Sequence, residues 1–99
     1  MRAIQIGVTR SCLGVSDPKE ILWPEERATL EQMIASFTIN GAYANFLEKT
    51  TGSIETGKAA DLIVLDRNLF FMAPETIGEA RVILTLFAGK TVFSDGTLR

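Results

Sequence analysis

Residues 50–66 read TTGSIETGKAADLIVLD, and in this stretch the pattern of the chain changes from helical to extended. Residues 53–58 are mostly small or polar, which is typical of a tight turn in which Gly57 has a positive φ. Residues 60–65 are rich in Leu, Ile and Val, the composition of a β-strand. The stretch therefore predicts a turn followed by a strand, with Asp61 as an acid within an apolar segment.

Downstream of this stretch, the sequence predicts two further strands, over residues 80–87 and 91–94. Gly89-Lys90 between them indicates a hairpin with the glycine in the first central position. Pro74, followed by Glu75, favours one turn of helix that ends near residue 78.

Upstream of it, the pattern is helical. Apolar spacing in residues 1–9 favours a short helix, and Thr29-x-x-Gln32 is a capping box that predicts the start of a second one. Asn40 is the expected N-cap of a third helix that ends near Gly52. Helices followed by strands indicate the α+β class.

Most aromatic residues are expected in the hydrophobic core. The expected core aromatics are Phe37, Tyr43, Phe46, Phe87 and Phe93. Residues 70–72 (Phe-Phe-Met) form an apolar loop triplet that either packs under the sheet or contacts another part of the protein.

The composition excludes several classes of protein. The chain has 99 residues, 46% hydrophobic and 22% charged, with a net charge of −2. These values fit one small folded domain and give no electrostatic reason to expect nucleic acid or an anionic membrane as a partner. There is no histidine, which excludes Ser-His-Asp and Cys-His catalysis from this chain by itself. The single cysteine, Cys12, cannot form an internal disulfide, and we interpret it as an ordinary loop cysteine.

The turn contains a pattern that resembles a phosphate-binding loop, but its context argues against that function. Gly52 and Gly57-Lys58 have the required spacing, yet Ala59 replaces the hydroxyl residue that would hold magnesium. The segment also follows a helix and precedes a strand, the reverse of the usual order. Ser53 has no base to activate it as a nucleophile.

Two sets of acids need an interpretation. We expect Glu25, Glu26 and Arg27 to lie in solvent at the entry to a helix. The alternative, a paired-carboxylate catalytic site, is disfavoured because adjacent residues at a helix start do not face one another. Asp61 is expected to be a structural clamp, bonded to Lys58 or to backbone N–H groups of the preceding turn. The alternative, a metal ligand, lacks a second ligand nearby.

Residues 50–66 resemble the Gly-Ser-Ile-x-x-Gly-Lys-x-Ala-Asp-Leu-x-Val-Leu-Asp segment of metal-dependent amidohydrolases. Residues 22–33 and 38–44 are similar to the helix pair that precedes this segment in the amidohydrolase 3 family. Residues 6–10 resemble the Ala-Val-Thr-Arg helix end of that family, and residues 82–93 resemble its last strand pair. The resemblance covers nearly the whole chain, in order.

This resemblance implies that the chain is the C-terminal fragment of a longer protein. Residues 1–50 correspond to the terminal helices of a (β/α)8 barrel, and residues 51–99 to the C-terminal part of a small, composite β-sandwich. In the family, a His-x-His pair, further histidines, sometimes a modified lysine, and an aspartate hold one or two divalent metals, zinc being expected. All of these ligands would precede Met1, so we expect no cofactor, catalytic residue or metal ligand in this chain. The resemblance gives a structural turn-and-strand role to Gly52, Ser53, Ile54, Gly57, Lys58 and Asp61.

The expected function is that of a structural portion of a hydrolase acting on non-peptide amide or related C–N bonds, inactive alone. A contact between Arg10 and substrate is a hypothesis only. The expected partners are the N-terminal barrel and sandwich strands of the parent protein, together with self-association through exposed strand edges. The expected location is the cytoplasm. The alternative is a free-standing regulatory or interaction domain, similar to relatives called exoenzyme regulators.

Overall fold

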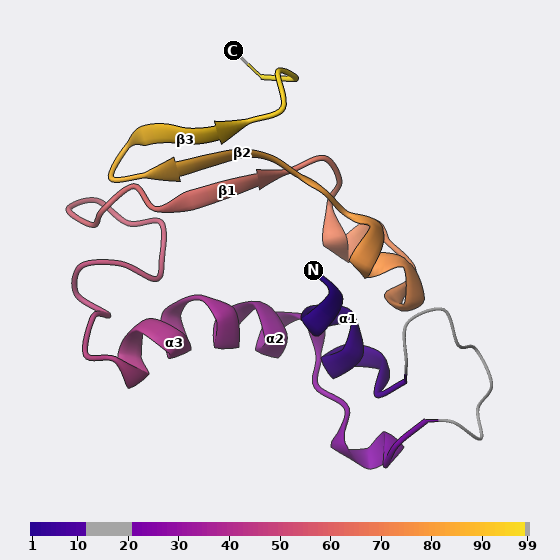
Figure 1. Ribbon diagram of the computed structural model, residues 1–99. Helices are drawn as coiled ribbons and strands as arrows, with labels where there is room; N and C mark the ends of the chain where they lie inside the picture. The colour runs from indigo at the N-terminus through magenta and orange to yellow at the C-terminus, as the bar shows by residue number, and fades with distance from the viewer. Residues whose placement is uncertain (12–20, 99) are drawn as a thin grey trace. The chain divides into compact units, whose positions relative to one another are not determined.

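The computed structural model describes residues 1–11 and 21–98 (Figure 1). The chain divides into two compact units, one made of Met1–Ile34 and Arg67–Arg81, the other of Ala35–Asp66 and Val82–Arg99. Helices and strands are both present, which confirms the α+β class. The expectation for Cys12 lies outside the described residues.

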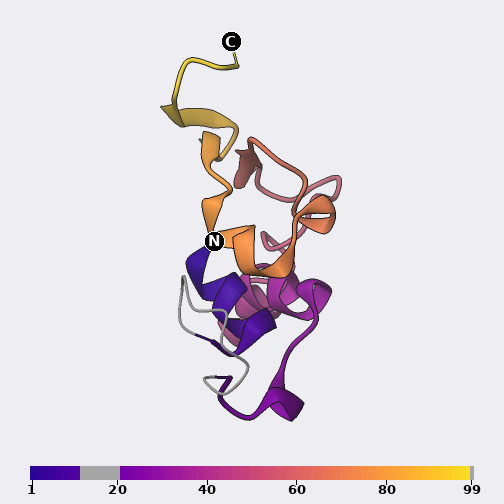
Figure 2. The same cartoon turned by 90° about the vertical axis from the view of Figure 1, so that its right-hand side faces the viewer.

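The first unit is built around the α-helix α1 (Arg2–Thr9), as the apolar spacing predicted. It packs against the 3-10 helix η4 (Pro74–Glu79), which begins at the expected proline (Figure 2). The buried apolar side chains of this unit are those of Ile4, Leu69, Ile77 and Ala80. Gln5 is buried among them, and its Oε1 accepts a hydrogen bond of 2.6 Å from the backbone N–H of Gly78.

Two shorter 3-10 helices complete the first unit, η2 (Pro24–Glu26) and η3 (Leu69–Phe71). The acids Glu25 and Glu26 lie in η2 and are exposed, as expected of a solvated entry. The triplet at residues 70–72 is only partly covered, since Phe71 is almost fully exposed.

The α-helix α2 (Leu30–Phe37) starts where the capping box predicted. The backbone N–H of Thr29 donates to Gln32 Oε1 at 2.9 Å, and the backbone N–H of Gln32 donates to Thr29 Oγ1 at 3.1 Å. The two bonds satisfy donors that have no partner inside the helix.

The prediction for the next helix was wrong at both ends. The helix α3 (Ile39–Ala44) has Thr38 at its N-cap position, so Asn40 lies inside the helix. It ends at Ala44 and not near Gly52, because Phe46 takes a left-handed conformation with φ 59°. A residue with positive φ cannot continue an α-helix.

The second unit contains an antiparallel sheet of three strands, β1 (Leu62–Leu65), β2 (Val82–Phe87) and β3 (Lys90–Ser94). The strand order is β1-β2-β3, so β2 is central (Figure 1). Thr85 lies opposite Ile63 of β1 and Phe93 of β3, and the register shifts once in each strand pair. All three strands were predicted, each with slightly different ends.

The hairpin between β2 and β3 differs from the predicted one. Ala88 and Gly89 are its two central residues, with φ values of 51° and 79°, and Phe87 lies opposite Lys90. Positive φ at both central positions is the signature of a type I′ turn, whose twist suits a two-residue hairpin. Gly89 is therefore in the second central position, not the first.

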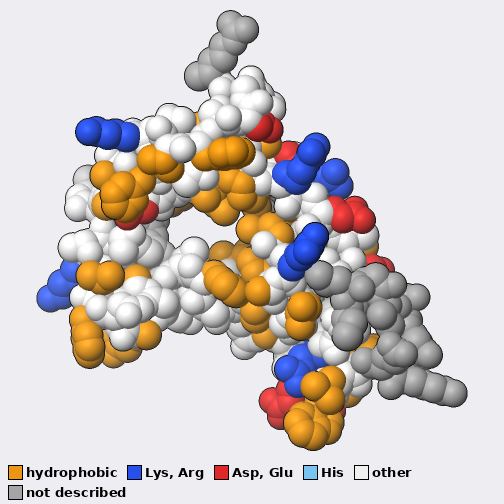
Figure 3. Space-filling view, in the orientation of Figure 1, with side chains coloured by type: hydrophobic (Ala, Val, Ile, Leu, Met, Phe, Trp, Pro, Cys, Tyr) orange, Lys and Arg blue, Asp and Glu red, His pale blue; other side chains and the backbone are white. Residues whose placement is uncertain are grey.

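The expectation that five aromatic residues form the core was wrong. All five are exposed, and Phe46 is 91% exposed. Hydrophobic side chains are visible at the surface in Figure 3. The sequence pattern identified apolar faces, but it could not show whether the chain itself contains enough structure to cover them. Within the described residues, no helix has the length and hydrophobicity needed to cross a membrane.

Candidate functional site

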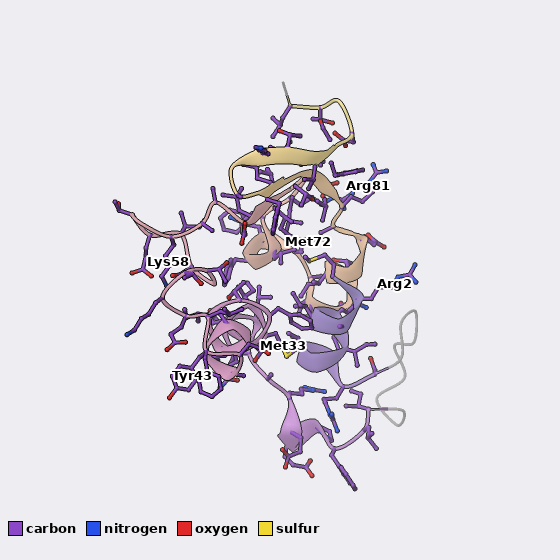
Figure 4. All side chains as sticks on the ribbon, turned by 60° about the vertical axis from the view of Figure 1, so that its left-hand side comes forward. Arg2, Met33, Tyr43, Lys58, Met72 and Arg81 are labelled. Atoms are coloured by element: carbon purple, nitrogen blue, oxygen red, sulfur yellow. The ribbon has the colours of Figure 1, made fainter. Side chains whose placement is uncertain are left out.

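The turn at residues 53–58 is held by three polar side chains. The Ser53 hydroxyl hydrogen-bonds to Glu55 Oε2 and accepts a bond of 2.7 Å from Lys58 Nζ. Lys58 Nζ also lies 2.9 Å from Glu55 Oε2, and the Lys58 side chain can be found in Figure 4. The pKa of Glu55 is lower than its ordinary value. The largest cause is the hydrogen bond from Ser53, and the hydrogen bond and positive charge of Lys58 add to it.

Two glycines shape the backbone of this turn. Gly57 has φ 90°, as predicted, and Gly52 has φ 99°. A Cβ at Gly52 would lie 2.7 Å from the Cβ of Ala42 in α3, so only glycine fits there. Gly52 thus lets the chain pass directly beside α3 on its way to β1.

Asp61 connects this turn to the β2–β3 hairpin. Its Oδ2 accepts a hydrogen bond of 3.2 Å from Thr51 Oγ1, and its Oδ1 accepts one of 2.8 Å from the backbone N–H of Ala88. Beside this contact, the N–H of Gly89 donates to the carbonyl of Ala60 at 3.1 Å. The carboxylate therefore bridges two turns that are distant in sequence.

The partners of Asp61 are not those that the sequence predicted. Lys58 bonds to Ser53 and Glu55 instead, and the N–H group comes from the hairpin rather than the preceding turn. Thr51 and Ala88 were missed altogether. No sequence signal marks Ala88 as the donor, because alanine is not one of the residues that typically begin a type I′ turn.

Lys58 joins the serine and the glutamate of the turn. Lys58, which sequence reasoning did not place near Ser53, donates to both the hydroxyl and the Glu55 carboxylate, so the ammonium group is engaged as a donor. Ile54 is almost fully exposed beside them. The backbone N–H of Lys58 donates to the carbonyl of Glu55 at 3.2 Å, a bond within the turn itself.

No metal centre can be assembled from the described residues. They contain no group of three or more His, Cys, Asp or Glu side chains that could hold an ion. Both oxygens of Asp61 already accept hydrogen bonds from the chain. The side chain of Arg10 is also engaged, because its Nε donates to the carbonyl of Leu22 at 3.0 Å.

Comparison with known proteins identifies the family. The sequence profile of the amidohydrolase family matches residues 2–93. The chain belongs to the amidohydrolase family. An imidazolonepropionase of Bdellovibrio bacteriovorus is 37% identical over 78 residues, which are 76% of this chain and 17% of that enzyme. An N-substituted formamide deformylase of Arthrobacter pascens is 33% identical over 100 residues, covering 87% of this chain and 17% of that enzyme.

A solved structure agrees with these relatives. An amidohydrolase from Thermotoga maritima superposes with a TM-score of 0.59 at 31% identity, over 71% of this chain and 17% of that chain. The family resemblance seen in the sequence is thereby confirmed. The chain spans about one sixth of the length of the relatives that it matches.

Proposed function

We propose that this chain is the C-terminal structural portion of an amidohydrolase-type hydrolase that acts on non-peptide amide or related C–N bonds. The observation that carries the proposal is the family match over residues 2–93 combined with coverage of only 17% of each relative. One of these relatives is named as a deformylase of N-substituted formamides, compounds with a C–N bond.

In this proposal the chain is inactive by itself. The metal of such an enzyme, when bound, activates water for attack on the C–N bond. The chain has no histidine, and its described residues do not fit a metal centre. Its own residues serve to shape and connect: Gly52 and Gly57 set the path of the chain, and the Asp61 carboxylate ties that path to the hairpin.

The exposed apolar residues support a role in packing against the rest of the enzyme. Large apolar side chains of α2, of α3 and of the residues directly after α3 are exposed, namely those of Phe37, Tyr43, Phe46 and Leu47. Exposed apolar patches mark interfaces, and we infer that these side chains pack against the rest of the enzyme. We assign residues 1–50 to the end of a barrel domain and residues 51–99 to a β-sandwich, each completed by preceding parts of the parent protein.

A direct experiment is to assay the purified chain for metal and for hydrolysis. After dialysis against a metal-free buffer, elemental analysis is expected to find far less than one equivalent of zinc, manganese or iron. Hydrolysis of N-substituted formamides is expected to stay at the buffer rate when zinc is added back. A stoichiometric, tightly held metal ion or metal-dependent turnover would overturn the proposal.

A further inference from the structure

Met33 of α2 packs directly on Gly7 of α1. A Cβ atom added to Gly7 would overlap the Sδ and Cε atoms of Met33 and would lie 3.1 Å from its Cγ. The thioether therefore occupies the space that a side chain at position 7 would fill, and Met33 with its sulfur is visible in Figure 4. Glycine is unfavourable inside a helix, and the close approach of Met33 gives a physical reason for its presence in α1.

The same glycine also holds the chain segment that leads into α2. The carbonyl of Gly7 accepts a hydrogen bond of 3.0 Å from the backbone N–H of Ala28, shortly before α2 starts at Leu30. Gly7 follows the first turn of α1, so its own N–H bonds within that helix. The N–H groups of Gly7 and Ala28 are therefore both engaged as donors.

A polar atom on the Met33 sulfur would disturb this contact. A thioether packs as an apolar group, whereas methionine sulfoxide is polar and larger at the sulfur. The sulfoxide oxygen accepts hydrogen bonds, and a buried acceptor without a donor costs free energy. Because the N–H groups of Gly7 and Ala28 are engaged, we expect the oxidised side chain to turn toward solvent and to leave α1.

We propose that Met33 is a site of reversible oxidation whose sulfoxide loosens the packing of α2 on α1. The Met33 side chain is only half-buried, so it is open to a small oxidant. Both partners of the contact belong to the first unit of this chain. The proposal therefore does not depend on the reaction or the length of the parent enzyme.

The oxidant in this proposal is hydrogen peroxide. A lone pair of the sulfur attacks one peroxide oxygen, and the O–O bond breaks. The released hydroxide takes the proton of the transferred oxygen and leaves as water. The sulfur is oxidised by two electrons and the peroxide is reduced by the same two. Methionine sulfoxide reductases, one for each sulfoxide epimer, return the side chain to the thioether.

Peroxide treatment of the whole chain tests the proposal. A Cys12→Ser background removes the thiol that would also react, and mass spectrometry measures sulfoxide at the three methionines, Met1, Met33 and Met72. Oxidation of Met33 is expected to lower the ratio of folded to unfolded chain about tenfold, as measured by urea unfolding. Treatment with the two reductases is expected to restore the original ratio.

Three variants locate the effect. Met33→Leu keeps an apolar side chain of similar volume but has no sulfur, and we expect it to resist the loss. Met72→Leu, the matched change at another half-buried methionine, should lose stability as the unmodified chain does. Gly7→Ala displaces the thioether before oxidation, so oxidation should then cost less, because two changes at one contact are not additive.

Three outcomes would each refute this role of Met33. They are complete sulfoxide at Met33 with an unchanged unfolding curve, a Met33→Leu chain that loses as much stability as the Met72→Leu chain, and a Met33 that stays reduced while Met1 and Met72 are oxidised. Circular dichroism before treatment verifies that each variant is folded. If Met33→Leu does not fold, the oxidation and reductase experiment on the chain with its native methionines decides.

Discussion

The carboxylate of Asp61 accepts a hydrogen bond of 2.8 Å from the backbone N–H of Ala88, a residue 27 positions later in the chain. The bond fixes the end of the turn segment to the hairpin that joins β2 and β3. The second oxygen of Asp61 binds Thr51, so one side chain holds both turns. This connection explains why an acid stands just before the apolar strand β1.

Removal of this carboxylate should destabilise the sheet. In Asp61→Ala, the N–H of Ala88 and the hydroxyl of Thr51 lose their acceptors, although both are near solvent. We expect the free energy of unfolding to fall by about 1 kcal/mol, and by less in Asp61→Asn, which keeps one acceptor oxygen. Urea unfolding measures both, with Glu26→Ala as a control at another exposed acid. Equal stabilities of Asp61→Ala and the control would contradict the clamp.

A substitution of Ala88 by glycine should raise the stability of the chain. It has φ 51° in the type I′ turn, a conformation that an L-residue with a Cβ adopts at a cost. Ala88→Gly removes this cost, and we expect a gain of about 0.5–1 kcal/mol. The reverse change in the neighbouring residue, Gly89→Ala, should lower stability by a similar amount. The new Cβ would make only an ordinary contact of 3.9 Å with Ala60 Cβ, so the φ of 79° is what opposes it. Thermal unfolding should rank Ala88→Gly above the unmodified chain and Gly89→Ala below it.

The Ser53–Glu55–Lys58 turn should lose stability in acid. The pKa of Glu55 is lower in the folded chain than its ordinary value, because Ser53 and Lys58 stabilise the carboxylate. The stabilisation is therefore complete above the ordinary pKa of glutamate and is lost as the pH falls through the lowered value. Unfolding measured between about pH 6 and about pH 3 should show a shallower pH dependence in Glu55→Gln than in Glu26→Gln. Identical profiles for the two variants would refute the role of this turn.

The buried amide of Gln5 should be needed for packing between α1 and η4. Gln5→Met keeps the volume of the side chain but leaves the N–H of Gly78 without its acceptor. We expect a loss of about 1–3 kcal/mol in unfolding free energy. Ala3→Met, at an exposed position of the same helix, should change stability little. A loss in Gln5→Met no larger than in Ala3→Met would show that the bond contributes nothing.

Local features of the fold were predictable from the sequence. The capping box at Thr29 and Gln32, the start of η4 at Pro74, and the three strands all depend on residues within a few positions of one another. The turn type at Ala88 was not predictable in the same way, because alanine rarely adopts a positive φ.

Features that depend on distant contacts were predicted poorly. Phe46 was expected in the core and is 91% exposed, since burial depends on what covers a residue and not on its hydrophobicity. The partner of Asp61 was expected to be Lys58 or a backbone N–H group of the preceding turn, whereas the sheet topology brings Ala88 to it. Sequence spacing could identify the acid as unusual but could not identify its donor.

The central claim is that this chain is one part of a longer amidohydrolase-type enzyme, and the length of the natural protein tests it most directly. Mass spectrometry of the protein from the cells that produce it, read together with the gene upstream of Met1, gives that length. We predict a polypeptide several times longer, with a His-x-His motif in frame before Met1. A natural protein that starts at Met1 and has no upstream coding sequence would contradict the claim and favour a free-standing regulatory domain.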